Sequence, residues 1–197
     1  MILQSLLTHL GLRFPSLIDL FLLEPERVVS DDRIILEETI LPYFAQSVSA
    51  NKVLFVGCAA YTRRYNDVFG TKEYWTIDPK RVKRKYGSQR HIVDSIVRID
   101  RHVVKNYFDL IIMNGVIGFG LNGRRDIERA IKACYEVLAS QGILLVGWND
   151  TAGRAPVDIR AIPAIGQFRE YYFEPLQACH YRTAGWQRHT YSFYQKA

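Results

Sequence analysis

The sequence is poor in cysteine and lacks any long apolar run. Its three cysteines, Cys58, Cys134 and Cys179, lie far apart and form no C-x-x-C pair. That spacing argues against a metal site and a disulfide framework, and reduced thiols fit an intracellular protein. No apolar stretch reaches the roughly 18 residues of a membrane span, and the apolar N-terminus lacks the basic segment and cleavage site of a signal peptide. We therefore expect a cytoplasmic protein without a bound metal and without membrane contact.

Acidic residues are also in deficit. The 197 residues include 26 Lys and Arg against 20 Asp and Glu, a formal net charge of +6, and the densest basic run is residues 80–85 (KRVKRK). This excess makes nucleic acid a partner to consider, although aromatic residues do not alternate with the run as they do in a surface that stacks bases. The simplest interpretation of the run is a solvated face, and the alternative is contact with an anionic substrate or partner.

Apolar runs and helical patterns alternate along the chain after a helical N-terminal part. Short helices are predicted at residues 2–10 and 16–23, and a longer one starts at Asp31-Asp32 and is expected to kink at Pro42. Between the later strands, residues 125–139 form an amphipathic helix that Gly142 follows. Strands are predicted at residues 52–57, 74–77, 91–93, 108–113, 143–147, 169–173 and 189–195.

Strands separated by helical segments predict an α/β fold with a mostly parallel sheet, and the last two strands predict an antiparallel edge. We expect one domain over residues 1–197, in which residues 1–48 are a helical extension and residues 49–197 form the core. Open α/β sheets bind ligands beyond the carboxyl ends of their strands. Residues that directly follow the strands are therefore the candidates for function, and they are Gly57-Cys58-Ala59, Asp78, Asp94, Asn114-Gly115 and Trp148-Asn149-Asp150.

The first of these turns, VLFVGCAAYTRRY, favours a ligand without phosphates. Gly57 permits a positive φ and close approach of a ligand, and Cys58 and Ala59 are small. The turn lacks the G-x-G-x-x-G pattern that cradles a pyrophosphate. A ligand with an amino-acid tail and a ribose fits better, and the alternative is a tight strand–helix junction without a ligand.

Two carboxylates follow the next two strands. Asp78 lies 21 residues after Gly57, a spacing at which α/β proteins place the acid that accepts hydrogen bonds from ribose hydroxyls. Its alternative role is to form the turn before Pro79. Asp94, followed by Ser95, is placed to accept a hydrogen bond from an adenine amino group, or to cap the following helix. After the next strand, Asn114 and Gly115 are expected to face the reactive end of the ligand.

The order of these segments resembles the class I S-adenosylmethionine-dependent methyltransferases. This chain contains, in the order typical of the family, the segments VLFVGCA, YWTIDPK, HIVDSI, FDLIIMNGVIGFG and GILLVGWND. The final segment RHTYSFYQK looks like the family's antiparallel last strand. The resemblance implies a Rossmann-like, doubly wound sheet of seven strands, S-adenosyl-L-methionine as cofactor and S-adenosyl-L-homocysteine as product.

The resemblance also implies roles for single residues. Gly57 matches the family's cofactor glycine and Asp78 its ribose-binding acid. Asp94 matches the adenine-side acid, and Asn114 the position that lines the methyl-transfer site. The predicted cofactor site is completed by their neighbours Cys58, Ala59, Tyr61, Pro79, Ser95 and Gly115. Where the family's first turn carries two or three glycines, this chain has one; either Tyr61 covers the methionine tail, or cofactor binding is weakened or lost.

Methyl transfer from a sulfonium is a one-step displacement, which needs alignment and exclusion of water. A general base is needed only if the acceptor must lose a proton. Candidate catalytic residues are Asp150 after strand 143–147, His180 in the predicted loop between the last two strands, and His189 at the start of the last strand. The alternatives are a polar loop for Asp150 and structural roles for both histidines.

The small part of the chain outside the predicted core favours a small-molecule methyl acceptor, with residues 1–48 as a partial lid. Residues 80–85 follow the ribose acid, so we expect them at the rim of the site, where they favour a carboxylated or phosphorylated acceptor. Two alternatives stay open: a methyltransferase or binding protein for RNA or DNA, and a non-catalytic binding module with the same fold. The sequence does not predict the oligomeric state.

Overall fold

A computed structural model describes residues 30–151, 157–185 and 188–197. The helices predicted at residues 2–10 and 16–23 lie outside the described residues. Most of the predicted strands are present at or within two residues of their expected bounds. The strands are β1 (Lys52–Val56), β2 (Glu73–Ile77), β3 (Arg90–Ile92), β4 (Phe108–Asn114), β5 (Leu138–Asn149), β6 (Phe168–Glu170), β7 (His180–Arg182) and β8 (His189–Lys196).

The strands form a single sheet in the order β3-β2-β1-β4-β5-β8-β6, and β7 also pairs with β8. The first five are parallel, and β8 is antiparallel to β5. The path through the sheet has seven strands, as predicted, and an eighth short strand, β7, pairs with β8 beside β6. β6 pairs with residues 194–196 of β8, and β7 pairs with residues 190–192. The prediction that His180 lies in a loop is wrong, since His180 begins β7.

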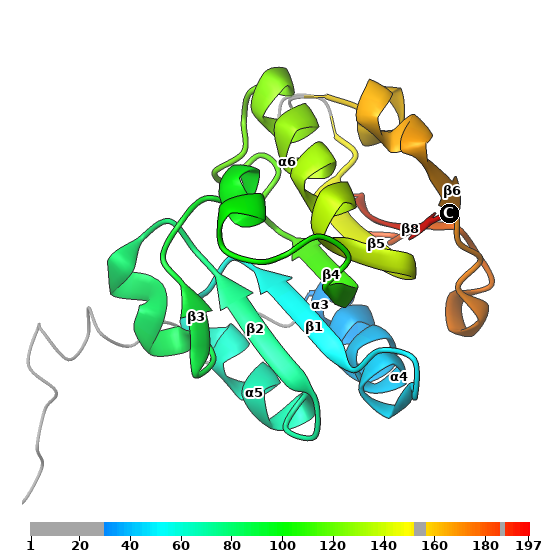
Figure 1. The fold of residues 1–197 in the computed structure, drawn as a ribbon. Helices are drawn as coiled ribbons and strands as arrows, with labels where there is room; N and C mark the ends of the chain where they lie inside the picture. The colour runs from blue at the N-terminus through cyan, green and yellow to red at the C-terminus, as the bar shows by residue number, and fades with distance from the viewer. Residues whose placement is uncertain (1–29, 152–156, 186–187) are drawn as a thin grey trace, which may run out of the picture.

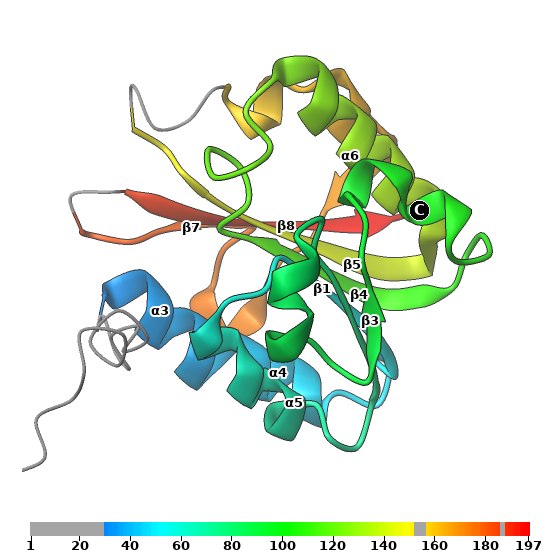
Figure 2. The ribbon, with the colours of Figure 1, turned by 90° about the vertical axis from the view of Figure 1, so that its left-hand side faces the viewer.

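Helices cover both faces of the sheet (Figures 1 and 2). The face that packs on the N-terminal helix carries a buried cluster that includes Phe44, Phe55 and Phe193, and the other face carries a cluster that includes Ile111, Ile131 and Val146. The helices are α3 (Asp31–Ile35), α4 (Leu41–Gln46), α5 (Tyr65–Val68) and α6 (Arg124–Val137), with a π-helix η1 (Leu36–Ile40). The 3-10 helices are η2 (Ala60–Arg64), η3 (Arg81–Tyr86), η4 (Ile96–Arg101), η5 (Ile159–Ala161), η6 (Pro163–Gln167) and η7 (Glu174–Leu176).

At Pro42, where a kink was predicted, the structure has a π-helix just before the proline. Pro42 has no N–H to donate, so it cannot close the normal helical hydrogen bond at that point. The helix widens just before it, over η1, and the Leu41 N–H donates to the Leu36 carbonyl five residues back. The chain from Asp31 to Gln46 thus remains helical across the proline.

The end of the long helix differs from the prediction. α6 stops at Val137, and β5 starts at once, so Gly142 lies inside a strand rather than after a helix. Gln141 takes a positive φ of 63°, and a Cβ on Gly142 would lie 2.8 Å from the Ala139 carbonyl oxygen. Gly142 is therefore required by close packing of the backbone. No helix among the described residues is long and apolar enough to cross a membrane.

Candidate functional site

The turn after β1 lies beside the end of β4 and depends on glycine. Gly57 has a φ of 87°, and a Cβ there would lie 2.9 Å from Cγ1 of Val116. Its N–H donates to the Ile77 carbonyl of β2, at 2.8 Å. Any L-residue at this position would be strained as well as crowded. The predicted turn glycine is thus confirmed as a conformational requirement, while its contact with a cofactor stays a prediction.

Asp78 lies behind this turn and holds it. One carboxylate oxygen accepts a hydrogen bond from the Cys58 N–H, and the other accepts one from the Lys80 N–H, each at 2.8 Å. The side chain is buried. The turn-forming role expected before the exposed Pro79 is therefore present. Each carboxylate oxygen has two lone pairs, so Asp78 can accept further hydrogen bonds, such as those from ribose hydroxyls.

The other residues of the first turn are small, apart from Tyr61. The Cys58 thiol is buried 4.0 Å from Nδ1 of His91, and its burial, with the Asp78 charge, raises its pKa to about 11. Ala59 is extended, and its N–H donates to the Thr62 hydroxyl. Tyr61 is 39% exposed, and the Arg33 guanidinium lies 3.7 Å from its ring centroid. Tyr61 thus connects the turn to α3.

Asp94 is surrounded by donors. Its carboxylate accepts hydrogen bonds from the Arg98 guanidinium, from Nε2 of His102 at 2.7 Å and from the Ser95 N–H at 2.7 Å. The bond to Arg98 and the other two hold the pKa of Asp94 well below its usual range. Ser95 precedes η4 without a side-chain cap. Asp94 is thus a fixed anion beyond β3, and its contact with an adenine stays a prediction.

Three polar side chains meet where β4 and β5 end and β8 begins. Oδ1 of Asn114 lies 2.9 Å from Nε2 of His189, and Oδ1 of Asn149 lies 2.7 Å from Nδ1 of the same ring. A Cβ on Gly147 would lie 1.8 Å from Oδ1 of Asn114, so only glycine leaves room for this arrangement. Gly115, by contrast, has a φ of 67° and open space where its side chain would be.

His189 is buried at the centre of this group and is neutral at physiological pH. Burial lowers its pKa to about 4, although the Asp32 charge acts in the opposite direction. A neutral imidazole donates from one nitrogen and accepts at the other. One of the two asparagines must therefore receive a hydrogen bond from the ring, and the other must present its NH₂ group to it. His189 fixes the orientation of both amides.

The burial of His189 predicts a loss of stability in mild acid. The unfolded chain binds a proton on His189 near pH 6.5, whereas the folded chain does so only near pH 4. The unfolded state therefore holds more protons in this window, and the free energy of unfolding should fall by up to about 3 kcal/mol as the pH drops from 6.5 to 4. Denaturant titrations across this range should show a smaller pH dependence for His189→Gln; an unchanged pH dependence would contradict the assignment.

Asp150 and His180 are not brought into this group. Directly opposite residues of paired strands point to the same face, so His189 and Asn149 share the face on which α3 and α4 pack. His180 pairs with Ser192 on the other face, where its ring lies 5.7 Å from that of Tyr194 and Nε2 lies 3.0 Å from Glu170. Of the two predicted histidines, only His189 lies beside Asn114.

Asp150 has cationic neighbours. Its carboxylate lies 3.8 Å from the Arg160 guanidinium and 3.7 Å from that of Arg182. Arg160 in turn lies over the Trp148 ring, on the face opposite His189. Asp150 therefore stays a prediction as a catalytic base, and its ion pairs in the described part of the chain are with Arg160 and Arg182.

α3 lies next to the Asn114–His189 group, within the segment 1–48 that we expect to be a partial lid. The Tyr191 hydroxyl donates to the Asp32 carbonyl oxygen at 2.6 Å, and the Tyr191 ring lies 4.8 Å from the His189 ring. Asp32 was expected only as a helix N-cap, and Gly147 only as the end of a strand. No local signal connects residue 32 with residue 191, so this contact was not predicted.

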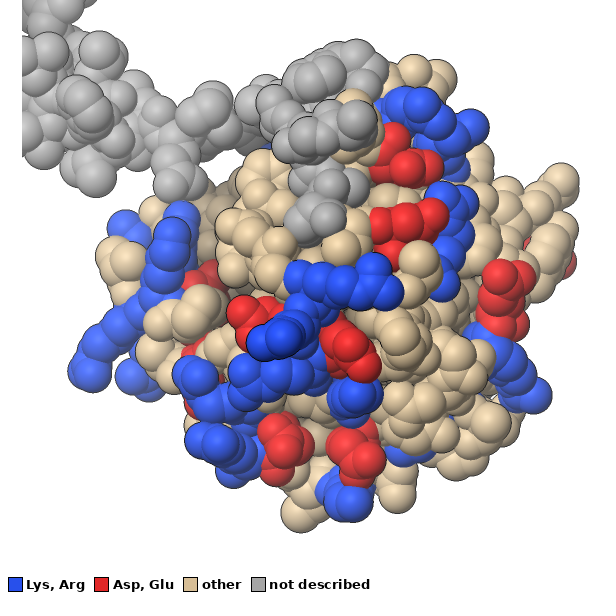
Figure 3. Space-filling model, turned by 90° about the horizontal axis from the view of Figure 1, so that it is seen from above, with Lys and Arg blue, Asp and Glu red and all other residues tan. Residues whose placement is uncertain are grey.

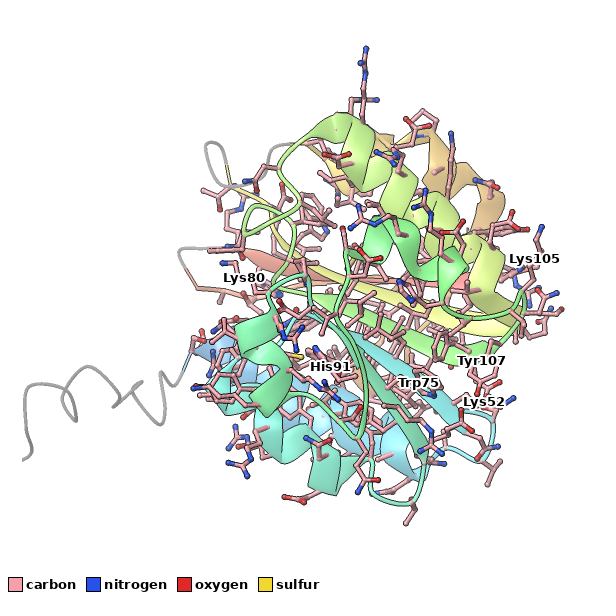
Figure 4. All side chains as sticks on the ribbon, turned by 60° about the vertical axis from the view of Figure 1, so that its left-hand side comes forward. Lys52, Trp75, Lys80, His91, Lys105 and Tyr107 are labelled. Atoms are coloured by element: carbon pink, nitrogen blue, oxygen red, sulfur yellow. The ribbon has the colours of Figure 1, made fainter. Side chains whose placement is uncertain are left out.

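The opposite end of the sheet is closed by paired side chains. Figure 4 shows Lys52, Trp75 and Tyr107 close together there. The Lys52 ammonium lies 4.4 Å from the Tyr107 ring centroid, and the Trp75 and Tyr107 rings are 5.9 Å apart. Glu73 accepts hydrogen bonds from the Trp75 indole and the Tyr107 hydroxyl. The polar side chains of the sheet that remain available to a ligand are therefore those at the carboxyl ends of the parallel strands.

No protein-family model and no curated protein sequence matches this chain. Solved structures do match. The N-methyltransferase NodS from Bradyrhizobium japonicum superposes with a TM-score of 0.63 at 18% identity, over 85% of this chain and 99% of that chain. A TehB-like S-adenosylmethionine-dependent methyltransferase from Corynebacterium glutamicum gives 0.58 at 17% identity, over 84% and 94%. A third, from Methanosarcina mazei, gives 0.58 at 10% identity, over 80% and 97%. The described chain has the fold of the class I S-adenosylmethionine-dependent methyltransferases.

Proposed function

We propose that the protein is an S-adenosylmethionine-dependent methyltransferase that acts on a small molecule. One observation carries the proposal: on a sheet with the methyltransferase topology, Gly57 and Asp78 directly follow the parallel strands β1 and β2, and Asn114 is the last residue of the adjacent strand β4. NodS has been solved in complex with S-adenosyl-L-homocysteine, and that structure superposes with a TM-score of 0.62 at 18% identity, over 85% of this chain and 93% of that chain.

The residues present fit this cofactor. Gly57 and Gly115 both have positive φ, and the space beside Gly115 is open. In the proposed site, the turn at Gly57 would receive the amino-acid tail, Asp78 the ribose and Asp94 the adenine. When bound, S-adenosylmethionine supplies a methyl group on a sulfonium, which is electrophilic without further activation. The chain itself would then supply alignment and exclusion of water.

Asn114 is the residue that would orient the acceptor. Its amide is held by His189, which is itself held by Asn149, so its position depends on two buried hydrogen bonds. Neutral His189 fixes the direction of this amide and leaves no charge beside the reacting atoms. α3, joined to β8 by the Tyr191 hydroxyl, would limit access of water and favour a small acceptor.

The finer proposal is that the acceptor is anionic. Residues 80–85 begin directly beside Asp78, since the Lys80 N–H donates to its carboxylate. Reversal of two charges, in Lys83→Glu/Arg84→Glu, is expected to raise KM for a carboxylated or phosphorylated acceptor about tenfold with little change in kcat, because charge steers the acceptor to the rim. The matched control is Arg129→Glu/Lys132→Glu on α6. Equal KM values in both variants would contradict an anionic acceptor.

Calorimetry with S-adenosyl-L-homocysteine tests the proposed function. We expect binding to the full chain, and absence of binding would favour the non-catalytic alternative. One observation supports that alternative: Asp78 and Asp94 already accept several hydrogen bonds from the protein. The nucleic-acid alternative predicts binding to RNA or DNA whose affinity falls steeply with salt.

A further inference from the structure

A large cavity lies on the α5 side of the sheet, away from the Asn114–His189 group. Its volume is about 1420 Å³, and its walls come from η2, α5 and the segment between η3 and β3. It exists because the connection from β2 to β3 contains only the six-residue η3, which is too short to cover this face. Drug-sized ligands occupy pockets of roughly 300–1,000 Å³, so the cavity has room for a small molecule. Gly57, Asp78, Asp94 and Asn114 do not line it, whereas Tyr61 does.

The positive charge of the protein is concentrated around this cavity. Residues 60–90 contain nine of the 26 Lys and Arg and three of the 20 Asp and Glu. Their formal charge therefore equals the +6 of the whole chain. The remaining residues include 17 Lys and Arg and 17 Asp and Glu, so their charges cancel. Figure 3 shows Lys and Arg side chains at the left of the molecule, the side on which η3 and β3 lie in Figure 1. An excess of positive charge on one part of the surface raises the local concentration of anions.

Two of the cations that line the cavity are not paired with carboxylates. Arg63 comes from η2 and Lys85 from η3, and these two elements contact each other. Both side chains are exposed, and no ion pair joins either of them to a carboxylate among the described residues. Arg64, in contrast, forms an ion pair with Glu37. Asp67 is the one carboxylate among the lining residues.

A buried hydroxyl group also lacks a partner. Tyr74 lines the cavity, its side chain is 6% exposed, and its hydroxyl has no hydrogen-bond partner among the described residues. A buried hydroxyl without a partner is costly, but this oxygen is closed off from the cavity and lies out of reach of a ligand there. The wall beside it is closely packed, because a Cβ on Gly87 would lie 2.3 Å from Nδ1 of His91. His91 is labelled in Figure 4 on the η3 side of β3.

We propose that this cavity binds a small molecule that carries two or more phosphate groups, at a site separate from the candidate methyl-transfer site. The Arg63 guanidinium and the Lys85 ammonium suit phosphate oxygens. A strand of nucleic acid would cross the mouth of the cavity, whereas a compact phosphorylated ligand fits inside its volume.

Calorimetry of the full chain with inorganic triphosphate tests the proposal. We expect binding that Arg63→Ala/Lys85→Ala weakens at least about tenfold. The matched control Arg129→Ala/Lys132→Ala removes the same charge from α6 and should change binding less than about twofold, because distant charges are screened by salt. Binding of S-adenosyl-L-homocysteine should be the same in Arg63→Ala as in the wild type, which separates this site from the proposed function.

Three results would overturn the proposal. The first is the absence of triphosphate binding by the wild-type chain. The second is an equal loss of affinity in the α6 control, which would show a general charge effect. The third is binding of single-stranded RNA that is lost in Arg63→Ala/Lys85→Ala, with no binding of triphosphate. That last result would assign the surface to nucleic acid.

Discussion

Asp78→Asn is expected to weaken binding of S-adenosyl-L-homocysteine about a hundredfold. The carboxylate is buried and accepts hydrogen bonds from the N–H groups of Cys58 and Lys80. An asparagine has one acceptor oxygen, so it cannot hold both amides and also accept bonds from ribose hydroxyls. Hydrogen bonds to a charged group contribute roughly 1.5–3 kcal/mol each, and the loss of one or two corresponds to this change in affinity. Calorimetry on the purified variant measures it.

The control for this prediction is Asp100→Asn, which makes the same chemical change at an exposed residue of η4. Its affinity should match that of the wild-type chain. Because Asp78 also holds the turn, we expect Asp78→Asn to lower Tm by several degrees, and a thermal melt reports whether the variant is still folded at the temperature of the titration. A folded Asp78→Asn protein with wild-type affinity would show that Asp78 serves only the turn.

Gly147→Ala is expected to reduce methyl transfer at least about a hundredfold while the protein still folds. The added Cβ would lie 1.8 Å from Oδ1 of Asn114 and 2.9 Å from Nε2 of His189. Both contacts are with the ends of side chains, so Asn114 can rotate away at a cost of about 1–3 kcal/mol for overpacking. The rotation breaks the Asn114–His189 hydrogen bond, and a displacement of about 1 Å can reduce a rate about a hundredfold.

Gly166→Ala is the matched control, because a Cβ there meets nothing within 4 Å. Activity with an acceptor found by screening, Tm and the NMR shifts of the His189 ring nitrogens should all be close to wild type in this control. In Gly147→Ala, the ring shifts should change along with the rate. Full activity in a Gly147→Ala protein with altered ring shifts would show that Asn114 does not position the acceptor.

Local patterns predicted most of the sheet and the positions of its functional turns. Short apolar runs that end in Gly57, Asp78 and Asn114 are readable because a strand buried on both faces must be apolar until it ends. The same logic failed for β7, whose three residues carry no periodic signal, and for Gly142, which looks like a helix terminator but lies within β5. Gly142 is there because the Ala139 carbonyl lies close to it, and that contact follows from the path of the backbone.

The sequence by itself determined the order of the strands along the chain, the glycine of the first turn and the acids after β2 and β3. Only the tertiary structure decided which polar residues meet. His180 and His189 look alike in sequence, but the pleat of β8 directs their partners to opposite faces, so only His189 reaches Asn114. The 75 residues between Asn114 and His189 give no local signal of this contact. Likewise, the basic residues of 60–90 were visible as charge, while the cavity they surround depends on how little of the sheet η3 covers.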